Sequence, residues 1–228
     1  MHIYMDYKDK YIKYKTKYLE LKNTNISNMI GGHPNLIIHI SGPSGAGKTT
    51  LGNKLERKYS NKIIVKDIDD LRMEFIKEHY GNKKWGVIDK NAYQQYIDDY
   101  INKQNKPLIF VGLNNMPWWH KDLYYDMHSI HKFYINIPDE TVIKQKCIRQ
   151  LHKLINLESD KMAMNDLIND NEKFIRLTTD VIKEECDAKQ IIKLNKKWNK
   201  DYKKQGYRFL SREKIYDVVC KISDKLFI

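Results

Sequence analysis

The chain has 228 residues, 41% of them hydrophobic, which suits one α/β domain with a sizeable core and a short appendage. No apolar run approaches the roughly 18 residues of a membrane-spanning helix, and the charged, aromatic N-terminus lacks the apolar stretch of a secretory signal. The three cysteines are odd in number and far apart, which argues against a disulfide framework or a cysteine metal site. We therefore expect a cytoplasmic protein with no membrane partner.

The net charge is +12, from 41 basic and 29 acidic residues. A basic chain can bind nucleic acid, but only six of its basic residues are arginine, the type that makes bidentate contacts in such sites. The abundance of Lys, Asn, Ile and Tyr is also what AT-rich codons produce, and the lysines are spread along the chain. Composition alone therefore does not favour a nucleic-acid partner.

The first residues of the chain have a composition of their own. Tyrosines between Tyr4 and Tyr18 recur at alternating spacings of three and four, with lysines between them. This spacing predicts a helix, although about two and a half heptads are too few for a stable coiled coil. Gly31-Gly32 then predicts a flexible joint. We expect an N-terminal helical extension over 1–32 and a globular domain over 33–228.

From Leu36 onward, short apolar runs alternate with amphipathic helices. Strands are predicted over 36–40, 63–65, 108–111, 133–137 and 207–210. Helices are predicted over 49–59, near 71–76, over 90–102, through most of 139–204, and after an N-cap at Ser211. Such alternation implies right-handed crossovers and a parallel sheet with helices on both faces. The predicted fold class is α/β with three layers, and 139–205 is a helical lid or insertion region.

The strongest motif follows the first predicted strand. Residues 42–49 read Gly-Pro-Ser-Gly-Ala-Gly-Lys-Thr and match G-x-x-x-x-G-K-[ST] at every fixed position. Glycines let such a loop curl so that its N–H groups point at an anion, and the following helix adds its positive end. Lys48 would then charge-pair with the β- and γ-phosphates, and Thr49 would ligate Mg²⁺. The predicted phosphate-binding residues are Gly42, Ser44, Gly45, Ala46, Gly47, Lys48, Thr49 and Thr50.

The segment from Ile40 to Thr50 resembles the P-loop of the nucleoside monophosphate kinase group, guanylate kinases especially. The wider pattern from Asn35 to about Gln150, half of the chain, resembles small P-loop kinases of the shikimate, gluconate, adenylate and polynucleotide kinase-like branches. This resemblance implies a three-layer P-loop NTPase fold, ATP with Mg²⁺, and phosphoryl transfer to an acceptor.

Acidic residues follow the second predicted strand. In the resembling kinases, acidic residues at this place face the P-loop, where they hold the acceptor, act as general base or contact Mg²⁺ through water. Ligands of parallel sheets bind beyond the carboxyl ends of the strands, where a carboxylate can take the proton of an acceptor hydroxyl. Asp67 and Asp69 are the candidates, with Arg72 as an anchor for an anionic acceptor. The alternative is an acidic cap for the following helix.

The third predicted strand lacks the Asp that many P-loop enzymes carry as Walker B, and Gly112 stands near its place. Shikimate-type kinases also have glycine there, which implies close approach of an acceptor, with Asn114 and Asn115 as contacts or as a turn. The missing acid argues against a motor ATPase or a switch GTPase. The aromatic loop 117–120 would stack on a base or simply pack. His39, inside the first strand, is expected in the core.

Arg149 is the candidate for stabilising a transition state. In the resembling kinases, a lid after the fourth strand supplies arginines that stabilise charge on the transferring phosphoryl group. A guanidinium suits that task, and arginine is rare in this chain. The usual set of several lid arginines is absent, so a solvated basic helix face is the alternative.

The N-terminal extension resembles a lysine–tyrosine leader found on various proteins of giant DNA viruses of the mimivirus type. This resemblance implies a location in host cytoplasm or in a virion. Because certain large DNA viruses process polyproteins after Gly-Gly, cleavage after Gly32 is a further hypothesis.

These features together predict an ATP-dependent kinase that transfers the γ-phosphate to a small acceptor, in the first place a nucleoside or a nucleotide. Lys48 would hold the donor phosphates, Asp67 or Asp69 would orient or deprotonate the acceptor, and Arg149 would close over the transition state. Two alternatives stay open. One is a polynucleotide 5′-kinase-like enzyme, and the other is an ATP-binding regulatory P-loop protein with little transferase activity.

Overall fold

The computed structural model describes residues 36–81, 88–115, 124–159 and 186–227, with five single positions between 172 and 183. The chain divides into two units between Asn35 and Leu36. The predicted extension over 1–32, its cleavage point and the aromatic loop 117–120 lie outside the described residues.

A five-stranded sheet, parallel throughout, forms the centre of the domain, as predicted. The strand order is β2-β3-β1-β4-β5. The strands are β1 (Ile37–Ser41), β2 (Ile64–Asp67), β3 (Leu108–Val111), β4 (His131–Ile135) and β5 (Arg208–Leu210). β4 begins two residues before the predicted strand because its first residues, His131 and Lys132, are polar and carry no apolar signal.

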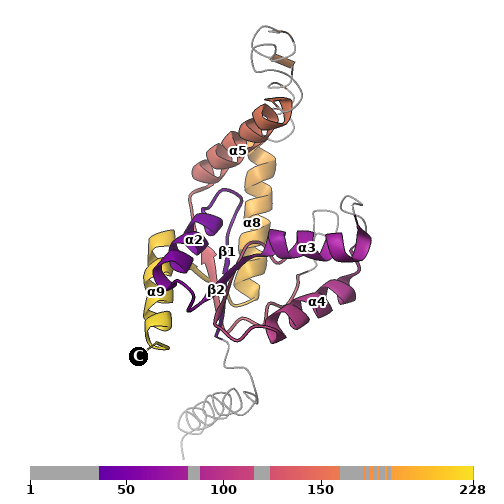
Figure 1. The fold of residues 1–228 in the computed structure, drawn as a ribbon. Coiled ribbons are helices and arrows are strands. Elements are labelled where there is room, and N and C mark those ends of the chain that lie inside the picture. The colour runs from indigo at the N-terminus through magenta and orange to yellow at the C-terminus, as the bar shows by residue number, and fades with distance from the viewer. Residues whose placement is uncertain are drawn as a thin grey trace, which may run out of the picture. The chain divides into compact units, whose positions relative to one another are not determined.

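Helices cover both faces of this sheet (Figure 1). They are α2 (Lys48–Tyr59), α3 (Ile68–Tyr80), α4 (Lys90–Asn102), α5 (Asp139–Ser159), α8 (Ala188–Lys204) and α9 (Arg212–Asp224). Alternate residues of each central strand face opposite sides, so Ile38 and Ile40 pack with α2 and α9, whereas Phe110 packs with α3 and α4. Strands buried on both faces are continuous apolar runs, which is why the sequence located them well.

A cluster of tyrosines attaches α8 to the carboxyl end of β3. Tyr202 of α8 is fully buried against Tyr134 and Tyr207. Its hydroxyl donates a hydrogen bond to Asn114 Oδ1 at 2.8 Å, and Asn114 Nδ2 donates to the carbonyl of Tyr125 at 2.7 Å. The position of α8 is therefore coupled to the edge of the sheet where the loops that follow β1 and β3 begin.

His39 is buried in β1, as the sequence predicted. Its Nε2–H donates to the carbonyl of Gly112 at 3.1 Å, and the Tyr207 hydroxyl donates to its Nδ1. Burial lowers the pKa of His39 to about 4, because the core cannot solvate the charged imidazolium. The ring is therefore neutral in the folded protein at pH 7.

His39 is expected to make the protein acid-sensitive. Between pH 4 and 6.5 the unfolded chain binds a proton at His39 that the folded chain does not, so stability falls as the pH falls through this window. At pH 4.5 the loss is about 2–3 kcal/mol from this residue alone. The free energy of unfolding, measured with urea, should change less between pH 7 and pH 4.5 in His39→Gln than in the wild type, because the glutamine amide cannot titrate. An equal difference in the two proteins would contradict this assignment.

The described part of the chain was compared with the requirements of a membrane-spanning helix, a metal site and a disulfide. No helix there is both long and apolar enough to cross a membrane. No group of three His, Cys, Asp or Glu side chains there is placed to hold a metal ion. None of the three cysteines, all within the described residues, forms a disulfide, and Cys220 is buried in the core between α2 and α9.

Candidate functional site

The predicted phosphate loop leaves the sheet at the carboxyl end of β1, between β3 and β4. The chain passes from β1 to α2 on one face, whereas the helices after β4 reach the other face, where α8 packs on Tyr134. Adjacent strands whose connections diverge to opposite faces leave a crevice beyond their carboxyl ends, the usual ligand site of open parallel sheets. The loop 42–47 lies at this point.

The start of α2 is built without a side-chain cap. Its N-cap is Gly47, in the left-handed region with φ of 80°, and no side chain accepts from the first turn. The N-caps of four other helices do accept such bonds, and they are Asp67, Asp89, Asp187 and Ser211. The first N–H groups of α2, at the positive end of the helix dipole, are thus left for an anion.

Lys48 places a positive charge on the same loop. Its Nζ donates hydrogen bonds to the carbonyls of Gly42 and Pro43, each at 2.9 Å. Burial lowers the pKa of Lys48 to about 8, although the nearby carboxylates of Asp69 and Asp67 act to raise it. The ammonium is charged at neutral pH, and its weak solvation favours an incoming anion.

The hydroxyl of Thr49 is paired with Asp67. Thr49 Oγ1 donates to Asp67 Oδ2 at 2.9 Å, while Asp67 Oδ1 accepts from the N–H of Asp69 at 2.9 Å. The alternative interpretation of Asp67, a cap for α3, is therefore confirmed. The same carboxylate also reaches the phosphate loop, although β3 lies between β1 and β2. The two roles coexist in one side chain.

Gly112, at the end of β3, has a packing role. A Cβ on this residue would lie 2.9 Å from Cβ of Ile68, the first residue of α3. Glycine is therefore needed for α3 to begin this close to β3, and this start places Asp67 beside Thr49. The structure gives a reason for this glycine that does not involve an acceptor.

Arg72 lies in a buried clamp. Its side chain is 6% exposed, and Nη1 donates to Asp69 Oδ1 at 3.1 Å. Nη2 donates to the carbonyls of Leu113 and Asn115 at 3.3 and 3.0 Å. The guanidinium fixes Asp69 and the chain after β3, so it is not presented to an anionic acceptor as the sequence suggested. Asn114 is likewise buried and occupied by Tyr125 and Tyr202.

The structure brings Arg149 of α5 to the phosphate loop. Its Nη1 donates to Ser44 Oγ at 3.4 Å, and the contact is exposed. One turn earlier on α5, Gln145 lies so close that a Cβ on Gly45 would be 2.7 Å from Gln145 Cβ. The helix therefore lies directly over the loop, in the place where the sequence predicted a lid.

Sequence reasoning missed a second arginine at the loop. Arg212 begins α9, and its Nη1 would lie 3.0 Å from a Cβ on Gly47. The side chain is half exposed and pairs only loosely with Glu213, at 3.4 Å. An arginine directly after a helix N-cap, in a chain with six arginines, was the available signal. Arg149 and Arg212 approach the loop from different helices.

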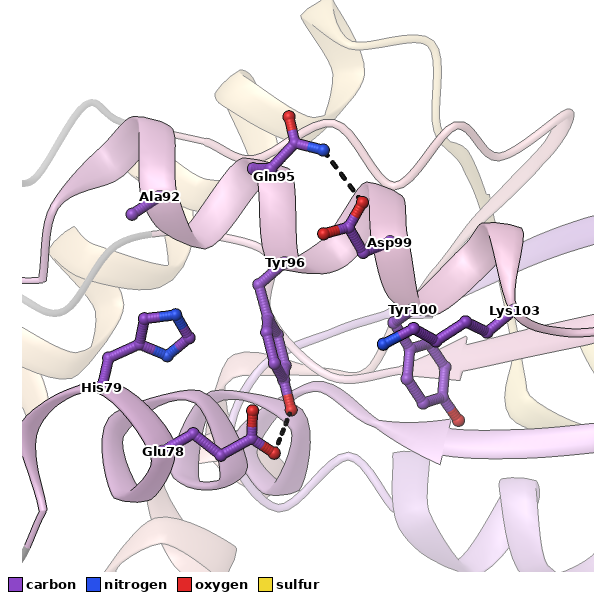
Figure 2. A pocket seen from close by; sticks show the side chains of 8 residues that line it. All are labelled: Glu78, His79, Ala92, Gln95, Tyr96, Asp99, Tyr100 and Lys103. Carbon is purple, nitrogen blue, oxygen red and sulfur yellow. Dashed lines mark hydrogen bonds between the residues drawn. The ribbon is translucent and has the colours of Figure 1, made fainter.

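A separate pocket of about 420 Å³ lies between α3 and α4 (Figure 2). Tyr96 donates to Glu78 Oε1 at 3.2 Å, and Gln95 Nε2 donates to Asp99 Oδ1 at 2.9 Å (Figure 2). Burial and Glu78 raise the pKa of Tyr96 to about 12, so its phenol stays protonated as the donor. These polar groups satisfy one another, and no residue of the phosphate loop lines the pocket. We assign it no chemistry.

Comparison with protein-family models gives no match for the chain, and comparison with curated proteins gives no relative. The chemical interpretation therefore rests on the geometry of the loop and its neighbours. That geometry joins an uncapped helix start, a half-buried lysine, a hydroxyl–carboxylate pair and two arginines.

Proposed function

We propose that the chain is an ATP-dependent P-loop kinase that transfers the γ-phosphate to a hydroxyl of a small acceptor, a nucleoside or a nucleotide. The observation that carries the proposal is the meeting of Lys48, Asp67 and Arg149, from three separate elements, around one loop. The proposal places the chain with the nucleoside monophosphate kinases, which its loop resembles, and with the shikimate kinase-like enzymes, which the wider pattern from Asn35 to about Gln150 resembles.

The residues present fit the phosphates of ATP and a magnesium ion. The uncapped N–H groups of α2 can donate hydrogen bonds to a phosphate chain, and the ammonium of Lys48 can offset its negative charge. Thr49 and Asp67 offer the hard oxygen ligands that Mg²⁺ prefers, and they already lie 2.9 Å apart. Bound Mg²⁺ supplies neutralisation of the phosphate charge. Asp67 would hold it directly or through water.

The side chains can then divide the work of transfer. Asp69 is exposed at its carboxylate and held by Arg72, so it can accept the proton of the acceptor hydroxyl. The hydroxyl oxygen forms a bond to the γ-phosphorus, and the bond to the β–γ bridging oxygen breaks, which releases ADP. Arg149, on the exposed side of the loop, supplies positive charge where the phosphoryl group passes.

Transfer of label from γ-labelled ATP tests this function. The purified full chain would be incubated with Mg²⁺ and pooled nucleosides, nucleoside monophosphates, small metabolites or a 5′-hydroxyl oligonucleotide. We expect label in one pool, and a loss of at least about 10³-fold in Lys48→Ala, because the charge on the transferred group is no longer offset.

Lys54→Ala is the matched control. Lys54 is exposed on the same helix, and its ammonium lies over the ring of Tyr216, 3.9 Å from the centroid. This variant should label normally. ATP binding without transfer to any pool would contradict the kinase proposal and favour a nucleotide-binding protein.

A further inference from the structure

Positive charge is concentrated on one helix of the described chain. The 17 residues of α8 contain seven lysines and one aspartate, a net charge of +6, which is half of the +12 of the whole chain. In contrast, α3 carries four carboxylates against two cations. A codon bias toward lysine would act on both helices alike, so the even spread inferred from the sequence does not describe this helix.

Six of these lysines share one side of α8. At 3.6 residues per turn they fall within an arc of about 100° and along about 22 Å of the axis. All six are exposed, and they are Lys189, Lys193, Lys196, Lys200, Lys203 and Lys204. We call this side the lysine face. The buried residues Ile191, Asn195 and Tyr202 lie on the opposite side.

No carboxylate of the described residues neutralises the lysine face. None of the six lysines forms an ion pair there, and Lys203 alone has a further partner, the ring of Phe209 at 5.2 Å. The one acid of the helix, Asp201, is bound by the Tyr124 hydroxyl at 2.9 Å. Like charges at spacings of three and four repel one another, so this arrangement favours a polyanionic partner.

We propose that the lysine face binds the sugar–phosphate backbone of a single-stranded nucleic acid. A flexible strand can follow a straight row of charges over its whole length, whereas a duplex is stiff over about 150 base pairs and meets a straight helix over a short part. Lysines serve this role without bidentate geometry, because phosphate contacts need charge and carry no sequence information. The scarcity of arginine argues only against sequence-specific contacts with the bases, not against binding of the phosphates.

On the side opposite the lysine face, α8 is bound to α5, the helix that covers the phosphate loop. Asn195 Nδ2 on α8 donates to Asp139 Oδ1 at the start of α5, at 2.7 Å. The two helices lie side by side (Figure 1), and α5 carries Arg149 to the loop. A strand on the lysine face would thus be separated from α5 by α8, and the two helices would link it to the loop. Binding itself does not depend on the kinase proposal.

Fluorescence anisotropy with a labelled 20-nucleotide oligothymidine tests the proposal, using the full chain without ATP between 50 and 200 mM salt. The variant K189Q/K193Q/K196Q/K200Q should bind about 10²–10³-fold more weakly at 0.1 M salt, and the slope of log affinity against log salt should become shallower by about 3. The control K54Q/K58Q/K221Q/K225Q removes the same charge from exposed lysines of α2 and the α9 end. It should keep the wild-type slope.

Circular dichroism and thermal melting would first show that both variants are folded. An unchanged slope in the α8 variant would overturn the proposal, and so would an equal loss in the control, which would indicate general charge rather than one face. A 20-base-pair duplex and phosphatidylserine vesicles serve as further probes. Tighter binding of either probe than of the single strand would overturn the choice of partner. Lys48→Ala should bind the oligonucleotide like the wild type, which separates this result from the kinase test.

Discussion

Replacing Arg149 with alanine is expected to lower kcat by about 10³-fold while leaving ATP affinity nearly unchanged. The guanidinium is exposed, and its contact with the loop is the 3.4 Å bond to Ser44 Oγ. Such a contact contributes little to the ground state, but charge that develops on a transferring phosphoryl group would strengthen it. Arginines in this role contribute about 10³–10⁵ in kcat in phosphoryl transfer.

Steady-state kinetics with the identified acceptor, together with calorimetric titration of ATP, would separate these effects. Lys144→Ala is the control. Lys144 is a cation on the same helix, but its side chain lines a surface hollow formed by residues of α5 itself. Arg149→Lys should recover only part of kcat, since an ammonium lacks the planar fork of a guanidinium. A variant that weakens ATP binding but keeps kcat would show that Arg149 only binds the donor.

The loop 42–47 and the start of α2 could be predicted because all their parts are local, whereas phosphate binding stays a prediction. Gly47, Lys48 and Thr49 act through the backbone and helix that they themselves form, so the motif determines both the loop and the start of α2. The central strands β1 and β3 were predictable for a related reason, because burial on both faces gives apolar runs that stand out from the polar helices. Even the capping residue Ser211 was correctly read from residue type and position.

The residues by themselves did not place the partners of that loop, because those places depend on strand order; Asp67 and Arg149 were expected there from the resemblance to small P-loop kinases. Asp67 reaches Thr49 across the end of β3, and nothing in the sequence states that β3 lies between β1 and β2. Arg212 comes from a helix more than 160 residues further along the chain. Arg72 looked available in the sequence, but three carbonyl and carboxylate acceptors occupy its guanidinium in the fold.

The lysine face was missed in the sequence for a different reason. The spacing of four, three, four and three from Lys189 to Lys203 is present in the sequence. Counting lysines over the whole chain hid it, since the basic residues of α8 were averaged with acidic helices such as α3. Charge counted helix by helix, and placed on the helix circumference, would have revealed the face.

Replacing Asp67 or Asp69 with asparagine should distinguish the roles of these two carboxylates beside the loop. Asp69→Asn is expected to lower kcat by about 10²–10⁴-fold at every Mg²⁺ concentration, because an amide cannot take the proton of the acceptor. Its oxygen can still accept from Arg72 Nη1, so the clamp that now spans 3.1 Å is kept. Asp67→Asn should instead raise the Mg²⁺ concentration needed for half-maximal rate, with kcat largely recovered at saturating Mg²⁺.

The amide substitution suits Asp67 because asparagine caps helices about as well as aspartate. In Asp67→Asn, Oδ1 can still accept from Asp69 N, while Nδ2 takes the place of Oδ2 and donates to Thr49 Oγ1, so the change removes charge and leaves the fold intact. Rates measured over a Mg²⁺ series, with thermal melting as the folding control, would decide the assignment. If Asp67→Asn lost kcat even at saturating Mg²⁺ while Asp69→Asn kept it, Asp67 would be the base. The bond between Thr49 and Asp67 would then be a proton relay at the loop instead of a prepared metal site.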